Sequence, residues 1–178
     1  MALLITETLR LRSLEEADAP ALWTCITRNK AYLQTWIPWV RDWNTADQVL
    51  EYIQDALHQI DAQEALSLGL FSEEQLIGIV SLQEWDHALG IAELGFWIDE
   101  AFQHKGIMRQ AIRRMMQFGF TEMKLNKVEV TFVRNNKRVQ QLMERLGFRI
   151  EGIIRNKLLH QGLPADRVVA GLLKQEFI

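Results

Sequence analysis

The segment Trp97–Met108, which reads WIDEAFQHKGIM, is the part of the sequence that decides the fold. A β-rich run ends near Ile98, a short polar loop follows, and a helical pattern begins at about Gly106. The first turn of a helix exposes unpaired backbone N–H groups and carries a partial positive charge, which together suit a phosphate. Because Gly106 has no Cβ, a ligand could approach the backbone closely there. The segment therefore predicts a pyrophosphate site at the start of this helix.

Basic residues flank the predicted turn: His104, Lys105 and Arg109 would all add positive charge beside it. Taken alone, a glycine three residues after Gln103 is a weak signal. A glycine that only eases a helix start next to solvated basic residues would give the same pattern. The context of the turn favours the phosphate site, because a meander precedes it and a strand-helix-strand unit follows.

That context is read from the periodicity of apolar residues. Three short β-rich runs separated by polar or glycine-bearing turns predict an antiparallel meander before the turn, at residues 65–71, 75–82 and 91–98. After it, the periodicity predicts a helix, a strand, a second helix ended by Gly147, and two closing strands around a turn at 162–164. These five elements are residues 106–123, 127–133, 136–146, 148–159 and 167–173.

The N-terminal third supplies one more strand and two helices. Residues 9–12 alternate apolar and charged, which is typical of a half-buried strand. Asp18 is a good N-cap before Pro20, and this first helix is expected to end at about Arg28. A tryptophan-rich stretch then leads to a second helix, which begins with the capping-box pair Thr45 and Gln48. The order predicts an α/β (α+β) protein with one mixed sheet, a single domain over residues 1–178 and a core of about 8–174.

Composition narrows the function classes. A formal charge of −3 and a pI near 5.8 argue against a nucleic-acid partner. The single cysteine, Cys25, excludes an internal disulfide and a multi-cysteine metal site, and the four histidines lack metal-ligand spacing. No basic leader and no long apolar run are visible, so we expect a cytoplasmic protein without a membrane span.

Several segments together resemble the GNAT acetyltransferase superfamily. Gln103, Gly106 and Met108 occupy the positions of its cofactor-loop pattern [Q/R]-x-x-G-x-[G/A], in which Met108 departs from the usual small residue. Residues 9–12 resemble the family's first strand, and residues 136–148 resemble its N-x-x-S-x-x-V-x-E-K-x-G-F segment. The ribosomal-protein-serine acetyltransferase branch is resembled by residues 36–39, 93–98 and 151–152, with Gly162 and Asp166.

The resemblance implies a GNAT fold, in which a single, mostly antiparallel sheet with a splayed central strand pair is flanked by about four helices. It also implies acetyl-CoA as co-substrate and no metal. The pantetheine arm would lie between the strands at 91–98 and 127–133 and pair with the backbone of the first. A backbone N–H near Trp97 would stabilise the developing oxyanion. The implied cofactor-binding residues are Phe96, Trp97, Ile98, Gln103, His104, Lys105, Gly106, Ile107, Met108, Arg109 and Asn136.

Two residues are candidates for catalysis. Glu93 is in register with Gly95 and Trp97 and could take a proton from the incoming amine, or it could be satisfied by a neighbouring arginine. Asn136 could hydrogen-bond the pantetheine or the sulfur but is a poor acid. Family members often protonate the leaving thiolate with a serine or tyrosine on the following helix. The matching positions here are Val139 and Met143, and neither can donate a proton.

On the acceptor side the resemblance points to Trp36, Trp39, His160 and Asp166 as substrate-binding residues, against core aromatics and solvated loop residues as the alternatives. The leading hypothesis is an N-acetyltransferase that acts on a protein or peptide N-terminal α-amino group, or on a small amine. A sensor that binds acetyl-CoA without turnover is the second hypothesis, and a Rossmann enzyme is disfavoured because G-x-G-x-x-G is missing. The branch resemblance also implies a homodimer formed through a strand edge.

Overall fold

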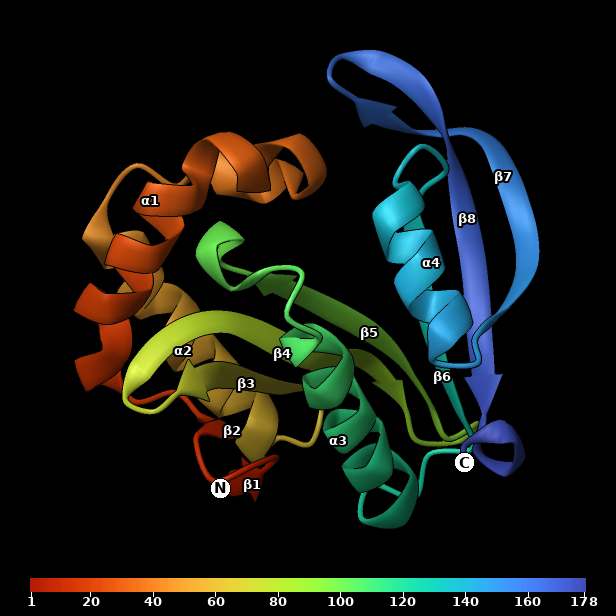
Figure 1. Cartoon of the computed structure of the whole chain (residues 1–178), viewed down its shortest axis with the longest axis horizontal. Coiled ribbons are helices and arrows are strands. Elements are labelled where there is room, and N and C mark those ends of the chain that lie inside the picture. The colour runs from red at the N-terminus through yellow and green to blue at the C-terminus, as the bar shows by residue number, and fades with distance from the viewer.

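A computed structural model describes all 178 residues, and a mixed sheet of eight strands runs through it (Figure 1). The spatial order is β1-β2-β3-β4-β5-β6-β8-β7. The strands are β1 (Ala2–Leu4), β2 (Leu9–Ser13), β3 (Leu66–Ser72), β4 (Gln75–Asp86), β5 (Ile91–Ile98), β6 (Lys127–Val133), β7 (Arg149–His160) and β8 (Leu163–Leu173).

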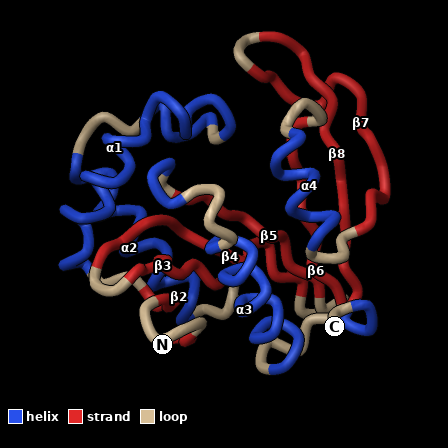
Figure 2. Tube along the Cα trace, viewed as in Figure 1, coloured by secondary structure: helices blue, strands red, loops and turns tan.

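Four α-helices pack on this sheet, and the blue segments of Figure 2 show them with the short 3-10 turns. The helices are α1 (Ala19–Trp36), α2 (Ala46–Asp61), α3 (Ile107–Thr121) and α4 (Lys137–Arg145). The 3-10 turns are η1 (Glu16–Asp18), η2 (Pro38–Asp42), η3 (Glu100–Phe102) and η4 (Lys174–Glu176). No helix is both long enough and apolar enough to cross a membrane.

The sheet opens at its centre. Every neighbouring pair of strands is antiparallel except β5 and β6, which are parallel and pair only from Ile91↔Lys127 to Glu93↔Glu129. Beyond Glu93, β5 continues to Ile98 along β4, while β6 continues to Val133 along β8. The predicted splayed pair and mostly antiparallel sheet are therefore confirmed.

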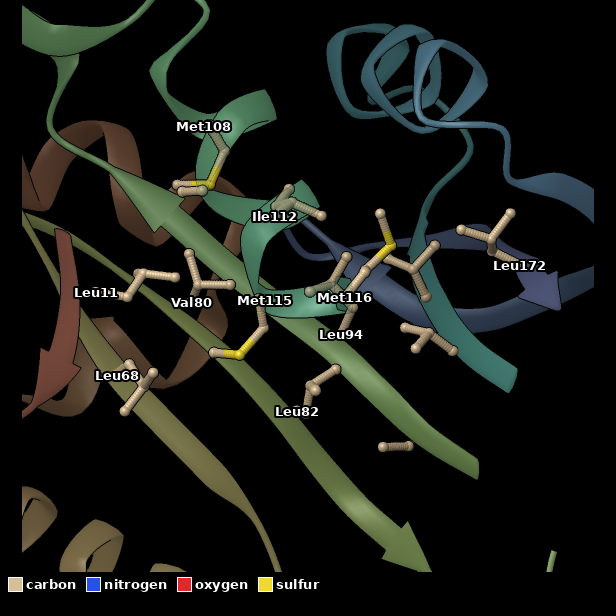
Figure 3. Packing of buried hydrophobic residues seen from close by; sticks show 14 of the residues in the cluster. Leu11, Leu68, Val80, Leu82, Leu94, Met108, Ile112, Met115, Met116 and Leu172 are labelled. Atoms are coloured by element: carbon tan, nitrogen blue, oxygen red, sulfur yellow. The ribbon is translucent and has the colours of Figure 1, made fainter. Parts of the chain in front are cut away.

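Each face of the sheet carries its own core. On one face, α3 and the buried side of α4 pack on the sheet in a cluster of 27 buried residues. Figure 3 shows Met108, Ile112, Met115 and Met116 of α3 against side chains from β2, β3, β4, β5 and β8. On the opposite face, α1 and α2 cover the first strands through 13 buried residues, Trp97 among them. The sheet is therefore covered by α3 and α4 on one face and by α1 and α2 on the other.

The first helix is longer than predicted. It does not end near Arg28 but runs to Trp36, because no breaker occurs until Pro38. The residue before a proline is driven out of the helical region, and Ile37 is accordingly extended at φ −121° and ψ 90°. Asp18 stands at the N-cap position of α1 as predicted, yet its side chain accepts no hydrogen bond from that helix. It accepts from the Glu15 N–H at 2.8 Å, in the capping box of η1, and binds Arg12 at 2.7 Å.

Other boundaries follow from local chemistry. The Thr45 N–H donates to Gln48 Oε1 at 3.1 Å, which confirms the capping box at the start of α2. The closing hairpin turns at Gln161 and Gly162, both at positive φ, so the predicted turn at residues 162–164 is one residue too late. The three-residue strand β1 was not predicted, because a run this short shows no alternation.

Candidate functional site

A cavity of about 1130 Å³ lies where β5 and β6 diverge. Its walls come from the end of α1, the free half of β5, the loop into α3, the outer half of β6, α4 and the tip of the β7–β8 hairpin. These elements surround the gap in Figure 1 between the green loop before α3 and the blue hairpin. A ligand pocket for one small molecule usually holds about 300–1,000 Å³, so this cavity has room for two substrates.

The turn into α3 has the geometry that an anion needs. Gly106 is the N-cap at φ 73°, and a Cβ placed there would meet no atom within 4 Å. The space that a side chain would fill is therefore open to a ligand. The N–H groups of the first helical turn, from Ile107 to Arg109, have no intrahelical partner and point out of the helix end. His104 precedes them in the left-handed region at φ 62°.

Met108 does not disturb this turn. Its side chain is only 8% exposed and lies in the core under α3, as Figure 3 shows. The departure from the small residue of the family pattern therefore fills the core and leaves the backbone N–H of Met108 in place. Lys105, in contrast, does not line the cavity. It is exposed, with its ammonium 5.0 Å from the centre of the Phe102 ring.

The N-terminal half of α4 faces the turn with basic groups that the sequence prediction missed. Arg138 donates from Nη2 to His104 Nε2 at 3.1 Å, which joins α4 to the loop across the gap. Lys137 and Arg145 also line the cavity. The sequence could have indicated these groups, because several basic residues lie close to Asn136 in the chain. These groups give the cavity a positive end, which suits the several phosphates of one cofactor.

Asn136 is the N-cap of α4 as well as a cavity residue. Its Oδ1 accepts a hydrogen bond from the Val139 N–H at 3.2 Å, while its Nδ2 remains free to donate to a ligand. Val139 lines the cavity and Met143 is buried at 1% exposure. Neither helix position supplies a proton donor, in agreement with the sequence.

A buried polar cluster anchors the loop that leads to the turn. Asp99, 1% exposed, accepts hydrogen bonds from the Arg28 guanidinium and from the Ala101 N–H, and the Glu100 N–H donates to Asn29. Burial alone would raise the pKa of Asp99, but these hydrogen bonds outweigh it and lower the pKa. Cys25 lies against the same carboxylate, and burial raises its pKa to about 12. The cluster ties α1 to the cofactor side of the cavity, and Cys25 is a packed thiol.

Glu93 stands at the point where β5 and β6 part. It is the last β5 residue paired with β6, it is half-buried, and its Oε1 accepts a hydrogen bond from Thr131 Oγ1 at 2.7 Å. The alternative of an arginine partner is wrong, since the partner is Thr131. Nothing in the sequence indicated Thr131, because it is brought to Glu93 only by the parallel pairing of the two strands. The other carboxylate oxygen of Glu93 has no hydrogen-bond partner in the protein, and Glu93 lines the cavity.

The free half of β5 offers backbone more than side chains. The Trp97 indole is 6% exposed and packs in the core of α1 and α2, and the backbone groups that β4 leaves unpaired belong to the alternate residues Leu94, Phe96 and Ile98. Ile98 is buried on the opposite face at 7% exposure, and Phe96 is half-buried against the same core. An extended ligand arm could therefore pair with this edge as an added strand would.

Aromatic residues line the part of the cavity between the end of α1 and the hairpin tip. Trp36 at the end of α1 stacks on His160 at the hairpin tip, with ring centres 4.7 Å apart, so these two predicted residues meet across the cavity. Trp39 packs on Trp43 and Tyr52, at 4.6 and 6.2 Å. Trp36, Trp39 and His160 all line the cavity. Tyr32 also lines the cavity, and burial raises the pKa of its hydroxyl.

The position of Asp166 corrects its predicted substrate role. Asp166 lies outside the main cavity, in a shallow hollow beside Ile153 and Ile154. Its carboxylate accepts from the Asn156 N–H at 3.1 Å and pairs with Arg134 at 3.1 Å. The hydrogen bond from Asn156 and then the Arg134 charge lower its pKa. Asp166 therefore links β8 to β7 and to Arg134 at a position outside the main cavity.

Comparison with known proteins identifies this arrangement. The family model described as acetyltransferase (GNAT) domain matches residues 8–149. The chain belongs to the GNAT acetyltransferase family. It is 32% identical over 174 residues to YdaF of Bacillus subtilis (strain 168), with 97% of this chain and 95% of YdaF covered. It is 25% identical over 151 residues to the ribosomal-protein-serine acetyltransferase of Escherichia coli (strain K12), covering 85% and 84% of the two chains.

The GNAT fold is also shown by solved structures. The structure of RimL, described as ribosomal L7/L12 alpha-N-protein acetyltransferase in complex with coenzyme A, superposes with a TM-score of 0.94 at 22% identity. That comparison covers 97% of this chain and 98% of RimL. The chain is thus an acyltransferase, and acetyl-CoA is its co-substrate. No group of three or more His, Cys, Asp or Glu side chains is placed to hold a metal ion.

The residues present fit acetyl-CoA. The open space at Gly106, the unpaired N–H groups after it and the cations of α4 would hold phosphates. The unpaired edge of β5 would hold the pantetheine amides, and this edge leads from the turn toward Glu93. Glu93 stands where β5 and β6 separate, so this edge ends beside its carboxylate.

Proposed function

We propose that this GNAT enzyme acetylates the α-amino group at the N-terminus of a protein, with Glu93 as the general base. The observation that carries the proposal is the placement of Glu93. One carboxylate oxygen accepts a hydrogen bond from Thr131 and the other has no partner in the protein. The residue lines the cavity at the point where β5 and β6 separate. A carboxylate oriented in this way can take a proton from an amine directly or through one water.

The chemistry favours an α-amino group over a lysine side chain. An amine attacks a thioester only when it is neutral. An α-amino group has an ordinary pKa near 8 and a lysine amine one near 10.4, so at neutral pH far more of the former is already deprotonated. A single carboxylate without a second base is sufficient for such an acceptor. The relatives named as ribosomal-protein acetyltransferases support a ribosomal protein as the acceptor.

Backbone groups would complete the reaction. Acetyl-CoA supplies an acetyl group activated as a thioester. A main-chain N–H next to Trp97 at the unpaired edge of β5, that of Phe96 or Ile98, would donate to the carbonyl oxygen as negative charge develops on it. The leaving thiolate has an ordinary pKa of roughly 8.5 by analogy with cysteine, so it can leave without a strong acid. Asn136 Nδ2 would hydrogen-bond near it, and water would protonate it.

The substitution Glu93→Gln tests the general base. We expect kcat to fall roughly 100-fold at pH 7, within the range for losing a general base, while acetyl-CoA affinity stays unchanged. The loss should shrink as pH rises toward 9, because the amine then deprotonates without help. The matched control is Glu129→Gln: Glu129 is the register partner of Glu93 on β6 and is equally half-buried, yet it pairs with Lys127 outside the cavity. Equal effects of the two substitutions would remove Glu93 as the base.

A panel of acceptors tests the function itself. Peptides with a free N-terminus should release coenzyme A thiol and gain one acetyl group by mass spectrometry. The same peptides with a blocked N-terminus and an internal lysine should not react. Acetyl-CoA binding without thiol release across the panel would instead favour a sensor without turnover, and preference for small amines would favour a small-molecule acetyltransferase.

The proposal extends to assembly and location. Three large apolar residues of the edge strand β7 are exposed: Ile150 at 46%, Ile153 at 43% and Ile154 at 44%. An unpaired edge strand with apolar side chains is suited to a second copy of itself, which supports a homodimer. Ile154→Lys should halve the mass observed by light scattering, and a monomeric wild-type chain would contradict the dimer. A cytoplasmic location is part of the same proposal, and a ribosomal-protein acceptor would support it.

A further inference from the structure

Arg167 is a cation inside the cavity that has no partner. It lies on β8, is half-buried, lines the cavity and makes neither a hydrogen bond nor an ion pair with the protein. Two arginines near the same hairpin are paired with carboxylates: Arg134 binds Asp166 at 3.1 Å and Arg149 binds Glu176 at 3.1 Å. A free guanidinium in a cavity wall is a group that a ligand can satisfy.

Arg167 faces the acceptor side of the sheet. The alternate β8 residues Val168, Ala170 and Leu172 are buried in the core under α3 and α4, so Arg167 points to the other face. Arg167 is the register partner of Val133, which shares a face with Thr131 and therefore with Glu93. This face is opposite the start of α3, where the cofactor phosphates fit. An acceptor, and not the cofactor, is the group that Arg167 meets.

The spacing between Glu93 and Arg167 sets the length of the acceptor segment. Val133 lies two residues beyond Thr131 on β6, a rise of roughly 6.6 Å, and Arg167 is one strand farther across. An extended peptide advances roughly 3.3 Å per residue. A peptide with its amine at Glu93 thus brings the side chain of its second or third residue to Arg167.

Glu93 and Arg167 carry opposite charges, so together they complement an acceptor that has both an amine and a carboxylate. The amine would meet the Glu93 carboxylate, and a carboxylate farther along the acceptor would meet the Arg167 guanidinium. Arginine binds carboxylates through two parallel hydrogen bonds, which makes the contact directional. A neutral acceptor that covers Arg167 would instead remove water from an unpaired charge, which is unfavourable. Both effects favour an acceptor that carries a carboxylate over a neutral acceptor.

We propose that Arg167 selects acceptors that carry a carboxylate within reach of the reacting amine, in a protein substrate at the second or third residue. Arg167 is thus a specificity-determining residue of the acceptor site. The inference rests on the proposed function, since it takes Glu93 as the place of the amine. A small amine that carries a free carboxylate would satisfy the same guanidinium, and the test separates the two sources.

The test compares peptides of ten residues with free N-termini that differ only by Asp or Asn at position 2, 3 or 8. For the wild-type enzyme, kcat/KM should be roughly 10-fold to 100-fold higher with Asp at position 2 or 3, the range for one charge-assisted hydrogen bond, and equal at position 8. Arg167→Gln should abolish this preference, and Arg167→Lys should keep part of it. The matched control is Arg155→Gln, since Arg155 lies on the same hairpin but outside the main cavity.

Each outcome bears on one claim. Equal rates for Asp and Asn peptides with the wild-type enzyme, or an intact preference in Arg167→Gln, would overturn the role of Arg167 while leaving the acetyltransferase function standing. Failure of every free N-terminal peptide to react would instead overturn the proposed function. A dipeptide that outperforms its C-terminal amide and also the ten-residue peptides would assign the carboxylate to a small acceptor. Unchanged acetyl-CoA affinity in Arg167→Gln shows that the variant is folded.

Discussion

The turn at Gly106 and the hairpin turn at Gly162 share a local backbone but not a setting. Gly106 has φ 73° and Gly162 has φ 80°, and a Cβ at either position would meet nothing within 4 Å. Gly106 opens the 15-residue helix α3, whose first N–H groups have no partner. Gly162 joins β7 to β8, whose flanking residues His160 and Leu163 pair with each other. A positive φ in open space is therefore not a ligand site by itself, and the unpaired main-chain donors behind Gly106 make the difference.

The same contrast holds for the two ends of the cavity. The donor end is mostly main chain from one continuous segment, from β5 through the turn into α3. The acceptor end is mostly side chains from elements far apart in sequence, such as Trp36 on α1, Thr131 on β6 and Arg167 on β8. A cofactor common to a family can be held by backbone geometry, whereas the acceptor is chosen by side chains that can change without altering the fold.

The largest expected effect is a loss of cofactor binding that distinguishes Gly106 from Gly162. Gly106→Val and Gly162→Val should each lower the free energy of unfolding by roughly 1–3 kcal/mol, because a β-branched residue is strained at positive φ. Only Gly106→Val should weaken acetyl-CoA binding, by about 100-fold, since its side chain fills the space at the helix start. Isothermal titration calorimetry and thermal unfolding measure the two quantities. A similar loss of affinity in Gly162→Val would show that strain alone explains the effect.

An intermediate effect sharpens the division between the donor and acceptor ends. Trp36→Ala removes the stack on His160 and should raise the KM for the acceptor peptide about fivefold to tenfold, the range for one aromatic pair. Neither kcat nor the KM for acetyl-CoA should change. Trp85→Ala is the control, because Trp85 stacks on His87 at 4.1 Å outside the cavity. A rise in the KM for acetyl-CoA would mean that Trp36 belongs to the donor end.

The smallest expected effect concerns the cluster that joins the two ends. The lowered pKa of Asp99 means that its stabilising contribution is complete above its ordinary value of 3.8 and is lost as pH falls below it. Asp99→Asn should therefore lower the free energy of unfolding by about 1–2 kcal/mol at pH 7 and flatten its decline between pH 5 and 3. Acetyl-CoA affinity should fall only about threefold. Chemical denaturation across pH measures this, and an unchanged acid sensitivity would contradict it.

Much of the fold could be predicted because its signals are local. The alternation in β6, the capping box of α2 and the glycine before α3 each lie within a few residues. The end of α1 could not be placed, since a tryptophan-rich run without a breaker is compatible with helix or loop until Pro38. The strand order β6-β8-β7 follows from tertiary pairing, which periodicity does not encode.

The residues of the candidate site fall into the same two groups: those indicated by local sequence signals and those brought together only by tertiary pairing. The residues of the predicted cofactor turn, apart from Lys105, all line the cavity, and the sequence could indicate them because a strand, a loop and a helix start follow one another in the chain. Thr131 and Arg167 were missed because the sheet alone brings them to the side of Glu93. Asp166 was misplaced for a similar reason. It is the neighbour of Arg167, but successive residues of a strand face opposite ways, and the prediction had no means to decide which of the two pointed inward.

The account depends most on the main chain of the turn into α3, and amide hydrogen exchange tests it directly. The N–H groups of Ile107, Met108 and Arg109 have no partner in the protein and should exchange fast without ligand. Saturating acetyl-CoA should slow them strongly, together with the free edge of β5 at residues 94–98, and should leave the β7–β8 hairpin unchanged. Unchanged exchange at residues 107–109 with protection elsewhere would contradict the account.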